Sequence, residues 1–239
     1  MIKLVVLDMA GTTVDEHGDV YAALAACVEE TGAVITPERV QKWMGADKME
    51  AISALIREGG GTPQAETVAA AFVRFKVLLA KRYDANPPVA LEGVEGAFAS
   101  FRRMGVKVAL TTGFSRDVAW PVLRKLGWKL TSDGGMLDAV VCSDEVAAGR
   151  PAPYMIHRAM ELAGVQDVRA VLAAGDTIVD LAAAHNAGVT AVGVLTGRLS
   201  RAALQEHPHH HIVAGVKDVP GLLSLSRSSD VRCPSFTGR

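Results

Sequence analysis

The stretch Lys3–Asp15, KLVVLDMAGTTVD, combines a short apolar run with an acidic residue at the point where the run ends. The run Leu4–Leu7 is too short for a helix, and its valines favour a buried strand. Asp8 follows directly, and Gly11 permits a turn behind it. Ligands of open parallel sheets bind beyond the carboxyl ends of the strands, so Asp8 is a candidate nucleophile or metal ligand. A plain turn-capping role is the alternative.

The composition is that of an ordinary globular protein without a strong electrostatic signature. The 239 residues are 49% hydrophobic and 21% charged, with a net charge of −1. This charge balance gives no indication of a surface that binds nucleic acid or an anionic membrane. Asp8 interrupts the N-terminal apolar run, so we expect no signal peptide there. The cysteines Cys27, Cys142 and Cys233 form no CxxC and predict no disulfide framework. We expect a cytoplasmic protein that acts on a small molecule.

Residues 16–89 carry helical patterns only. Thr36-Pro37 supplies an N-cap and a first-turn proline for one helix, which stops at Gly45, and Asp47 starts the next. A longer helix from about Pro63 to Tyr83 has one apolar stripe. Because no strand signal interrupts this block, we interpret it as a separate helical cap domain.

After Glu92, apolar strands alternate with helices. The predicted strands are Val106–Leu110, Ala139–Cys142, Val168–Ala174, Ala191–Leu195 and a weaker His211–Ala214. This alternation is typical of an α/β protein with a doubly wound parallel sheet. We therefore predict a Rossmann-like core domain from residues 1–15 and 90–226, and a flexible polar tail over 227–239. The cap domain would then lie over Asp8.

Four polar sites fall at or just beyond the predicted strand ends. They are Asp8, Thr112 with Gly113, Arg150, and Asp176 with Asp180. In their order and spacing around a helical insertion, they resemble the four motifs of the haloacid dehalogenase superfamily, and the resemblance covers nearly the whole chain. It implies a Rossmann-like core with an inserted cap, and a carboxylate nucleophile that forms an aspartyl-phosphate.

Attack of a carboxylate on a phosphoryl group brings two anions together and so calls for a divalent cation. Mg²⁺ prefers hard oxygen ligands and usually takes one or two carboxylates. Asp8 and Asp176 are the predicted ligands, the resemblance adds the backbone carbonyl of Ala10, and Asp180 would support them without touching the ion. A capped, solvated helix start is the alternative for Asp176 and Asp180. A second cluster, interpreted as an adventitious metal binder only, consists of His207, His209, His210 and His211.

The phosphoryl oxygens need donors with fixed geometry. We predict that the Thr112 hydroxyl and the Arg150 guanidinium supply them, with Arg150 as the charge clamp. An exposed arginine before Pro151 is the alternative. The other predicted contacts to substrate or phosphate are Ala10, Gly11, Gly113 and Met44, although Met44 also fits a plain core position.

Ala10 departs from the commonest superfamily pattern. Most superfamily phosphatases have a second aspartate here, which protonates the leaving alkoxide, and general acid catalysis of this kind contributes about 100- to 10,000-fold. One branch has the alanine: the phosphonatases, or phosphonoacetaldehyde hydrolases. DMAGTTV at Asp8–Val14 and GRPAP at Gly149–Pro153 are similar to the motifs of that branch.

The segment Met44–Lys48, MGADK, is similar to the cap-domain lysine motif of the same branch. The resemblance implies that Lys48 forms a Schiff base with a substrate aldehyde, so that the carbon–phosphorus bond breaks with an enamine as leaving group. No acid is then needed at Ala10. The amine must be neutral, which requires burial or nearby cations to lower its pKa. A solvated helix lysine is the alternative.

Two positions differ from the branch, which has a histidine where this chain has Ala51 and a tyrosine where it has Phe114. The leading hypothesis is therefore a Mg²⁺-dependent hydrolase of phosphonoacetaldehyde or a related 2-oxoalkylphosphonate. The alternatives are a phosphoglycolate phosphatase-like phosphomonoesterase, with Lys48 as a binding residue, and a non-catalytic binding protein on this fold. Homodimerisation through the cap is an expectation from the family alone.

Overall fold

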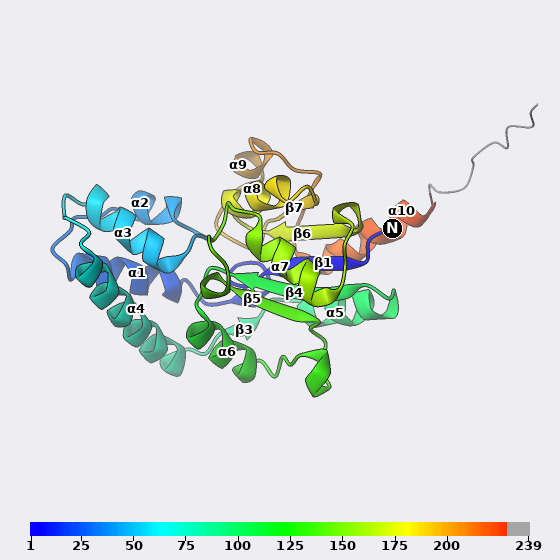
Figure 1. The fold of residues 1–239 in the computed structure, drawn as a ribbon, viewed down its shortest axis with the longest axis horizontal. Coiled ribbons are helices and arrows are strands. Elements are labelled where there is room, and N and C mark those ends of the chain that lie inside the picture. The colour runs from blue at the N-terminus through cyan, green and yellow to red at the C-terminus, as the bar shows by residue number, and fades with distance from the viewer. Residues whose placement is uncertain (229–239) are drawn as a thin grey trace, which may run out of the picture.

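Six parallel strands form one sheet in the computed structural model, which describes residues 1–228. The strand order is β5-β4-β1-β6-β7-β8. The strands are β1 (Leu4–Asp8), β4 (Lys107–Thr112), β5 (Ala139–Cys142), β6 (Val171–Gly175), β7 (Thr190–Val194) and β8 (His211–Val213). Helices cover both faces of this sheet (Figure 1), which confirms the predicted α/β doubly wound architecture.

Strand β1 lies in the middle of the sheet, between β4 and β6. All five of its residues are buried, because alternate side chains enter different hydrophobic clusters on the two faces. Val5 and Leu7 belong to one cluster, and Leu4 and Val6 to the other. This two-sided burial explains why the run is continuously apolar, and it fixes Asp8 at the carboxyl edge of the sheet.

The helices after the insertion divide between the two faces. They are α5 (Val94–Arg103), α6 (Arg116–Lys125), α7 (Tyr154–Ala163), α8 (Ile178–Asn186), α9 (Arg201–Gln205) and α10 (Val219–Ser228). Buried side chains of α5, α6 and α10 pack with Val5 and Leu7, whereas those of α7, α8 and α9 pack with Leu4 and Val6. Each face of β1 is thus covered by its own layer of helices.

Four further helices follow β2 (Val14–Asp15) and precede β3 (Val89–Ala90) in the sequence. Figure 1 shows them beside the sheet. They are α1 (Asp19–Glu29), α2 (Pro37–Lys42), α3 (Lys48–Glu58) and α4 (Ala65–Ala85), and we call residues 16–89 the helical insertion. Its buried side chains include Leu24, Leu55 and Phe75. Because β2 and β3 pair antiparallel, the chain enters and leaves the insertion at neighbouring points.

Some element bounds differ from the sequence predictions. Strand β6 begins at Val171, because residues 168–170 form a 3₁₀ turn in which the Asp167 carboxylate accepts a hydrogen bond from the Arg169 amide. Strand β4 extends through Thr112. The pair β2–β3 was not predicted, since two residues on each side are too few to show a period.

The C-terminal end of the described chain is helical. Helix α10 runs through Ser228, two residues into the predicted flexible tail; the rest of that tail, 229–239 with Cys233, lies outside the described residues. The thiols of Cys27 and Cys142 are free and buried. Within residues 1–228, no helix combines the length and the apolar character that a membrane crossing requires.

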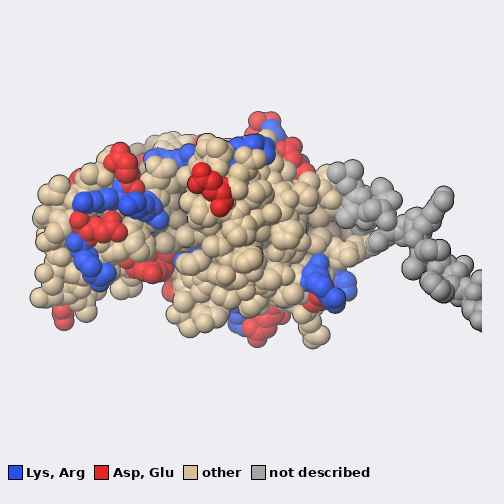
Figure 2. Space-filling model, turned by 90° about the horizontal axis from the view of Figure 1, so that it is seen from above, with Lys and Arg blue, Asp and Glu red and all other residues tan. Residues whose placement is uncertain are grey.

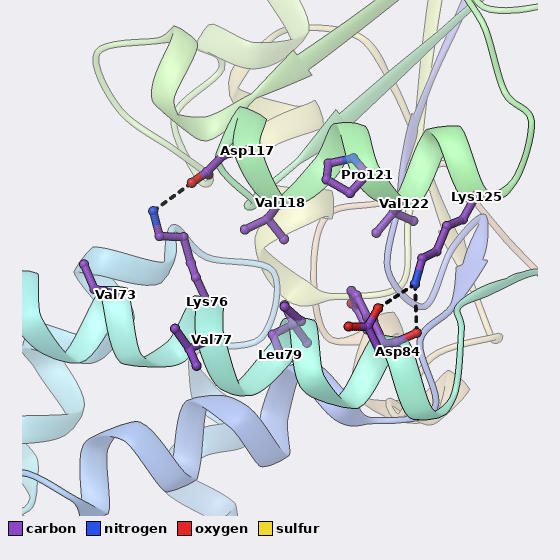
Figure 3. A pocket seen from close by; sticks show the side chains of 12 residues that line it. Val73, Lys76, Val77, Leu79, Asp84, Asp117, Val118, Pro121, Val122 and Lys125 are labelled. Atoms are coloured by element: carbon purple, nitrogen blue, oxygen red, sulfur yellow. Dashed lines mark hydrogen bonds and ion pairs between the residues drawn. The ribbon is translucent and has the colours of Figure 1, made fainter.

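The insertion also meets the rest of the chain along α4 and α6. A cavity of about 390 Å³ lies between these helices, with apolar side chains such as Val77, Val118 and Val122 in its lining. Two ion pairs cross it (Figure 3): Lys76 Nζ lies 2.7 Å from Asp117 Oδ2, and Lys125 Nζ lies 3.2 Å from Asp84 Oδ1. Exposed pairs of this kind stabilise a contact only modestly. In the face seen in Figure 2, acidic and basic side chains lie close together at one end and along the edges, and most of the middle is uncharged.

Candidate active site

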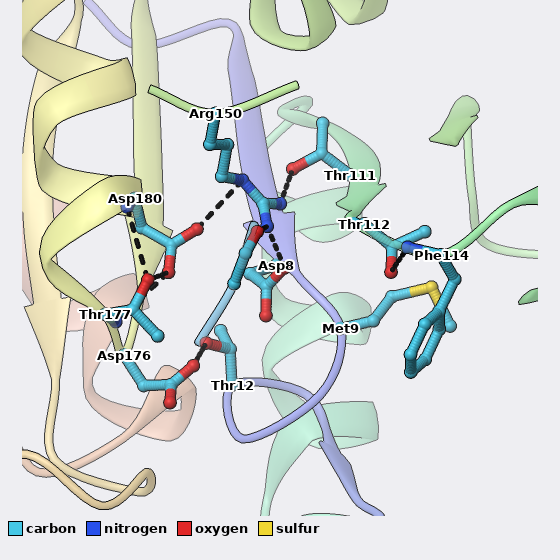
Figure 4. Close-up of polar contacts among 12 residues, drawn as sticks. Asp8, Met9, Thr12, Thr111, Thr112, Phe114, Arg150, Asp176, Thr177 and Asp180 are labelled. Carbon is cyan, nitrogen blue, oxygen red and sulfur yellow. Dashed lines mark hydrogen bonds and ion pairs between the residues drawn. The ribbon is translucent and has the colours of Figure 1, made fainter. Parts of the chain in front are cut away.

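The polar residues at the carboxyl edge of the sheet converge on one point (Figure 4). Asp8 ends β1, Thr111 and Thr112 end β4, and Asp176 directly follows β6. Asp180 lies in the first turn of α8, where the Thr177 amide donates to its Oδ2 over 3.0 Å in a capping box. Adjacent parallel strands therefore bring together residues that are far apart in the sequence.

Arg150 is the hub of this cluster and enters from the loop between β5 and α7. Its Nη1 lies 2.7 Å from Asp8 Oδ1 and its Nε 2.9 Å from Asp180 Oδ1. Its Nη2 donates to Thr111 Oγ1 over 2.7 Å. With 4% of its surface exposed, Arg150 is a buried residue and not a surface arginine.

Three buried carboxylates surround that single guanidinium. One oxygen from each of Asp8, Asp176 and Asp180 lies within 4.8 Å of the others. Thr12 Oγ1 donates to Asp176 Oδ1 over 2.8 Å, and a Cβ on Gly11 would come within 2.6 Å of Asp176 Oδ2. The chain around Asp176 is therefore packed directly against its carboxylate.

Burial strongly disfavours the charged forms of two carboxylates in this cluster. Burial raises the pKa of Asp8 to about 7, although Arg150 opposes the shift. Burial also raises the pKa of Asp176 well above its usual value, and the charges of Asp8 and Asp180 add to the effect. Buried oxygen ligands that lack compensating positive charge match what a hard divalent cation requires. The donor set therefore fits Mg²⁺.

Lys48 is the first residue of α3 and is buried, with 4% of its surface exposed. Its Nζ donates to the Ala46 carbonyl over 2.8 Å and lies 5.9 Å from the centroid of the Phe114 ring. Burial lowers the pKa of Lys48 to about 8; Arg150 adds to this shift, whereas Asp47 and Asp8 oppose it. About one amine in ten is then neutral at pH 7.

The loop that carries Lys48 approaches the sheet closely through glycines. Gly45 has a φ of 74°, and a Cβ there would lie 2.7 Å from Thr177 Oγ1. A Cβ on Gly113 would lie 2.6 Å from the Ala46 carbonyl oxygen. Arg150 Nη1 donates to the Gly45 carbonyl over 3.3 Å, so the loop touches the hub of the carboxylate cluster.

The other predicted residues lie near this cluster, with differences in detail. Thr112 Oγ1 accepts the Phe114 amide over 3.1 Å, and it is the neighbouring Thr111 that contacts Arg150. Ala10, Gly11 and Met44 line a cavity of about 170 Å³ beside Asp176. Ala51 is fully buried. Among the described residues, the histidines just before β8 and at its start take part in no possible metal-ligand group of three; they are His207, His209, His210 and His211.

Several residues at the site were not predicted from the sequence. Thr12 and Thr111 stand beside predicted positions in the same motifs, so the motifs could have indicated them. Tyr21 and Arg198 line the cavity next to Asp176. Neither has a local sequence signal, because one comes from α1 and the other follows β7.

Comparison with known proteins places the fold and the site in context. A sequence model of haloacid dehalogenase-like hydrolases matches residues 2–188. Phosphonoacetaldehyde hydrolase from Bacillus cereus is 34% identical over 213 residues, which are 82% of this chain and 76% of that protein. A phosphonoacetaldehyde hydrolase-like protein from Oleispira antarctica superimposes with a TM-score of 0.82 at 19% identity, covering 98% of this chain and 96% of that one. β-Phosphoglucomutase from Clostridium difficile superimposes with a TM-score of 0.81 at 17% identity, covering 97% of this chain and 100% of that one.

Proposed function

This chain belongs to the haloacid dehalogenase-like hydrolases, on their phosphonatase-like branch, and from this premise we propose that it cleaves the carbon–phosphorus bond of phosphonoacetaldehyde or a related 2-oxoalkylphosphonate. The observation that carries the proposal is Lys48: a buried amine with a pKa lowered to about 8, in a loop packed against the Asp8 cluster. An amine that is partly neutral at pH 7 can condense with a carbonyl. Ala10 supplies no acid for an alkoxide leaving group.

In the proposed reaction, the Lys48 amine condenses with the substrate carbonyl and releases one water. The carbon–phosphorus electron pair moves into the iminium as the phosphoryl group passes to Asp8, which leaves an enamine on Lys48 and an acyl-phosphate on Asp8. The enamine takes a proton on carbon, and one water hydrolyses the resulting imine. A second water hydrolyses the acyl-phosphate. One water is consumed overall, and the products are phosphate and an aldehyde or ketone.

Arg150 and the helical insertion have distinct parts in this proposal. Arg150 would bind the phosphoryl oxygens, with its position fixed by Asp180 and Thr111. Residues 16–89 would act as a cap domain that brings Lys48 over Asp8 and excludes water. Pairing of two copies through this cap remains a proposal from the family.

We propose Asp8, Asp176 and the Ala10 carbonyl as the Mg²⁺ ligands. Bound there, the ion would neutralise the carboxylates and polarise the phosphoryl group. Asp180 already contacts Arg150 and Thr177, so its role would be to orient Arg150.

Removal of the metal should abolish activity. Protein treated with EDTA is expected to release no phosphate from phosphonoacetaldehyde, and added Mg²⁺ should restore the full rate, because Asp8 cannot approach a phosphoryl dianion unaided. His209→Ala combined with His210→Ala is the matched control, and its Mg²⁺ dependence should be that of the unmodified protein. Full activity in chelator would refute this part of the mechanism.

Ala10→Asp separates carbon–phosphorus cleavage from ordinary phosphatase activity. The new carboxyl group would supply the missing general acid, so hydrolysis of phosphoglycolate should rise by up to about 100- to 10,000-fold. The unmodified protein should cleave phosphonoacetaldehyde far faster than phosphoglycolate, as measured by phosphate release. Efficient phosphoglycolate hydrolysis with Ala10 in place would favour the phosphomonoesterase alternative.

A further inference from the structure

One cavity adjoins the carboxylate cluster, and a second cavity shares a wall with it. The first, of about 170 Å³, is lined by Ala10, Gly11 and Asp176, and the second, of about 220 Å³, lies between α1 and α2 of the insertion. Their shared wall consists of Tyr21, Met44 and Arg198. A substrate bound at Asp8 therefore has room for a substituent on the side of Asp176.

The backbone at Arg198 is anchored beside the carboxylate cluster. Gly197 packs against the Asp176 carboxylate so closely that a Cβ at this position would clash with it. The side chain of Arg198 then lies with its Cζ 4.9 Å from the centroid of the Tyr21 ring. A Cβ on Gly18 would lie 2.5 Å from its Nη2, so the guanidinium fills the space above that glycine.

Arg198 holds its charge without an ion-pair partner. Over residues 1–228, no carboxylate lies in ion-pair contact with it, whereas Arg150 has two such contacts. Of the described residues that line the two cavities, Arg198 is the one cationic side chain. The Arg198 charge lowers the pKa of the buried Glu16 against the larger effect of burial, but among the described residues no ion pair occupies the guanidinium, so its donors are available to a ligand.

Four acidic residues share the lining of the two cavities, and three of them accept hydrogen bonds within the structure: Asp15, Glu16 and Asp176, whereas Glu29 is exposed. Glu16 is buried, and its Oε2 accepts the Val20 amide over 2.7 Å. Asp15 Oδ1 accepts the His17 amide over 2.8 Å. On the shared wall itself, the one charged side chain is that of Arg198, and it favours an anionic group at that point.

We propose that Arg198, assisted by the Tyr21 hydroxyl, binds a carboxylate of the substrate. This inference rests on the proposed function and narrows it: the substrate is a 2-oxoalkylphosphonate whose carbonyl carbon carries a carboxylate. Guanidinium groups bind carboxylates through paired, charge-assisted hydrogen bonds. With Lys48 at the carbonyl and the phosphoryl group at Asp8, the third substituent of the carbonyl carbon would extend toward Asp176 and the shared wall. The balance of the reaction is unchanged, and the product becomes a 2-oxo acid with phosphate.

Binding of two inert phosphonates tests the inference without turnover. 3-Phosphonopropionate has a carboxylate in the position of the third substituent of the carbonyl carbon, and propylphosphonate has a methyl group in the same place. By calorimetry with Mg²⁺ present, the full chain should bind 3-phosphonopropionate at least about tenfold more tightly than propylphosphonate, as expected for a charge-assisted hydrogen bond. Arg198→Met should reduce this preference to within about twofold, and Tyr21→Phe, which keeps the ring, should reduce it partly.

The controls separate the Arg198 guanidinium from general charge. Arg124→Met removes an exposed arginine that lines neither cavity, so the preference should be unchanged. Arg198→Lys keeps the charge and should retain part of the preference. An unchanged preference in Arg198→Met, or an equal loss with both phosphonates, would overturn the inference.

Turnover distinguishes failure of this inference from failure of the proposed function. The unmodified protein should cleave 3-phosphonopyruvate with a higher kcat/KM than phosphonoacetaldehyde, and Arg198→Met should remove that advantage through KM. If Arg198 governs carboxylate binding but neither compound is cleaved, the proposed function fails and the carboxylate subsite stands. If phosphonoacetaldehyde is cleaved equally well by both proteins and the binding preference persists in Arg198→Met, the subsite fails alone.

Discussion

Lys48→Arg is expected to abolish carbon–phosphorus cleavage while phosphate and Mg²⁺ still bind. Arginine keeps the positive charge, but its guanidinium stays protonated and forms no imine. Without the imine, the carbon–phosphorus electron pair has no acceptor, so we expect a loss of at least about 10,000-fold, comparable to removal of a covalent catalyst. Lys129→Arg, at an exposed position, is the matched control and should retain full activity.

Borohydride trapping locates the imine directly. Incubation with phosphonoacetaldehyde and borohydride should attach one carbon fragment and inactivate the protein, and peptide mapping should place the added mass on Lys48. The phosphomonoesterase alternative predicts no adduct there and substantial residual activity in Lys48→Arg. An adduct at another lysine would contradict the assignment.

The pH dependence of imine formation should follow Lys48. Its pKa lies below the usual value, at about 8, because burial penalises the charged form. The reactive species is the neutral amine, so trapping should accelerate as the pH rises toward 8 and then level off. A lysine with an ordinary pKa would show acceleration continuing to about pH 10.

Asp8→Asn should be the second variant with an almost complete loss of activity. An amide is a poor nucleophile toward phosphorus, and loss of a nucleophile costs up to about a millionfold in kcat. The contact to Arg150 can persist through the amide oxygen, so the fold should be retained. Rapid acid quenching should detect a phosphorylated Asp8 in the unmodified protein and none in this variant.

Asp133→Asn provides the matched control for that substitution. Asp133 is exposed, in a 3₁₀ turn of the sheet-bearing part of the chain. The activity of the Asp133→Asn variant should equal that of the unmodified protein. If Asp8→Asn still turns over any phosphonate or phosphate ester at an appreciable rate, a covalent role for Asp8 is refuted.

The main strands and the positions of Asp8 and Asp176 could be predicted because their signals are local. A continuous apolar run marks a strand buried on both faces, and the polar residue after it must lie at the carboxyl edge of the sheet. The predicted role of Thr112 stays a prediction, and the same logic could not show that Thr111 is the threonine that contacts Arg150. Successive side chains on a strand face opposite sides, so the choice depends on the residue at which β4 ends.

Contacts between distant segments could not be predicted from local patterns. Arg198 meets Tyr21 only because the β7–α9 loop and α1 converge beside Asp176. The burial of Lys48 likewise depends on packing of its loop against Gly113, and a helix N-terminus alone indicates an exposed lysine. Such features follow from tertiary packing between segments that are far apart in the sequence, and no short stretch of sequence shows them.

The central position of β1 has a consequence for how the chain folds. Leu4 pairs with Lys107 on one side and with Val171 on the other, so β1 must wait for partner strands that are synthesised much later. The helical insertion is synthesised in that interval and can collapse on its own short-range contacts, whereas closing the long loops to β4 and β6 is entropically slow. During that time the segment LVVL exposes apolar surface and unpaired backbone, as aggregation-prone strands do. The strand that ends at Asp8 is thus exposed to wrong pairing until β4 and β6 have been made.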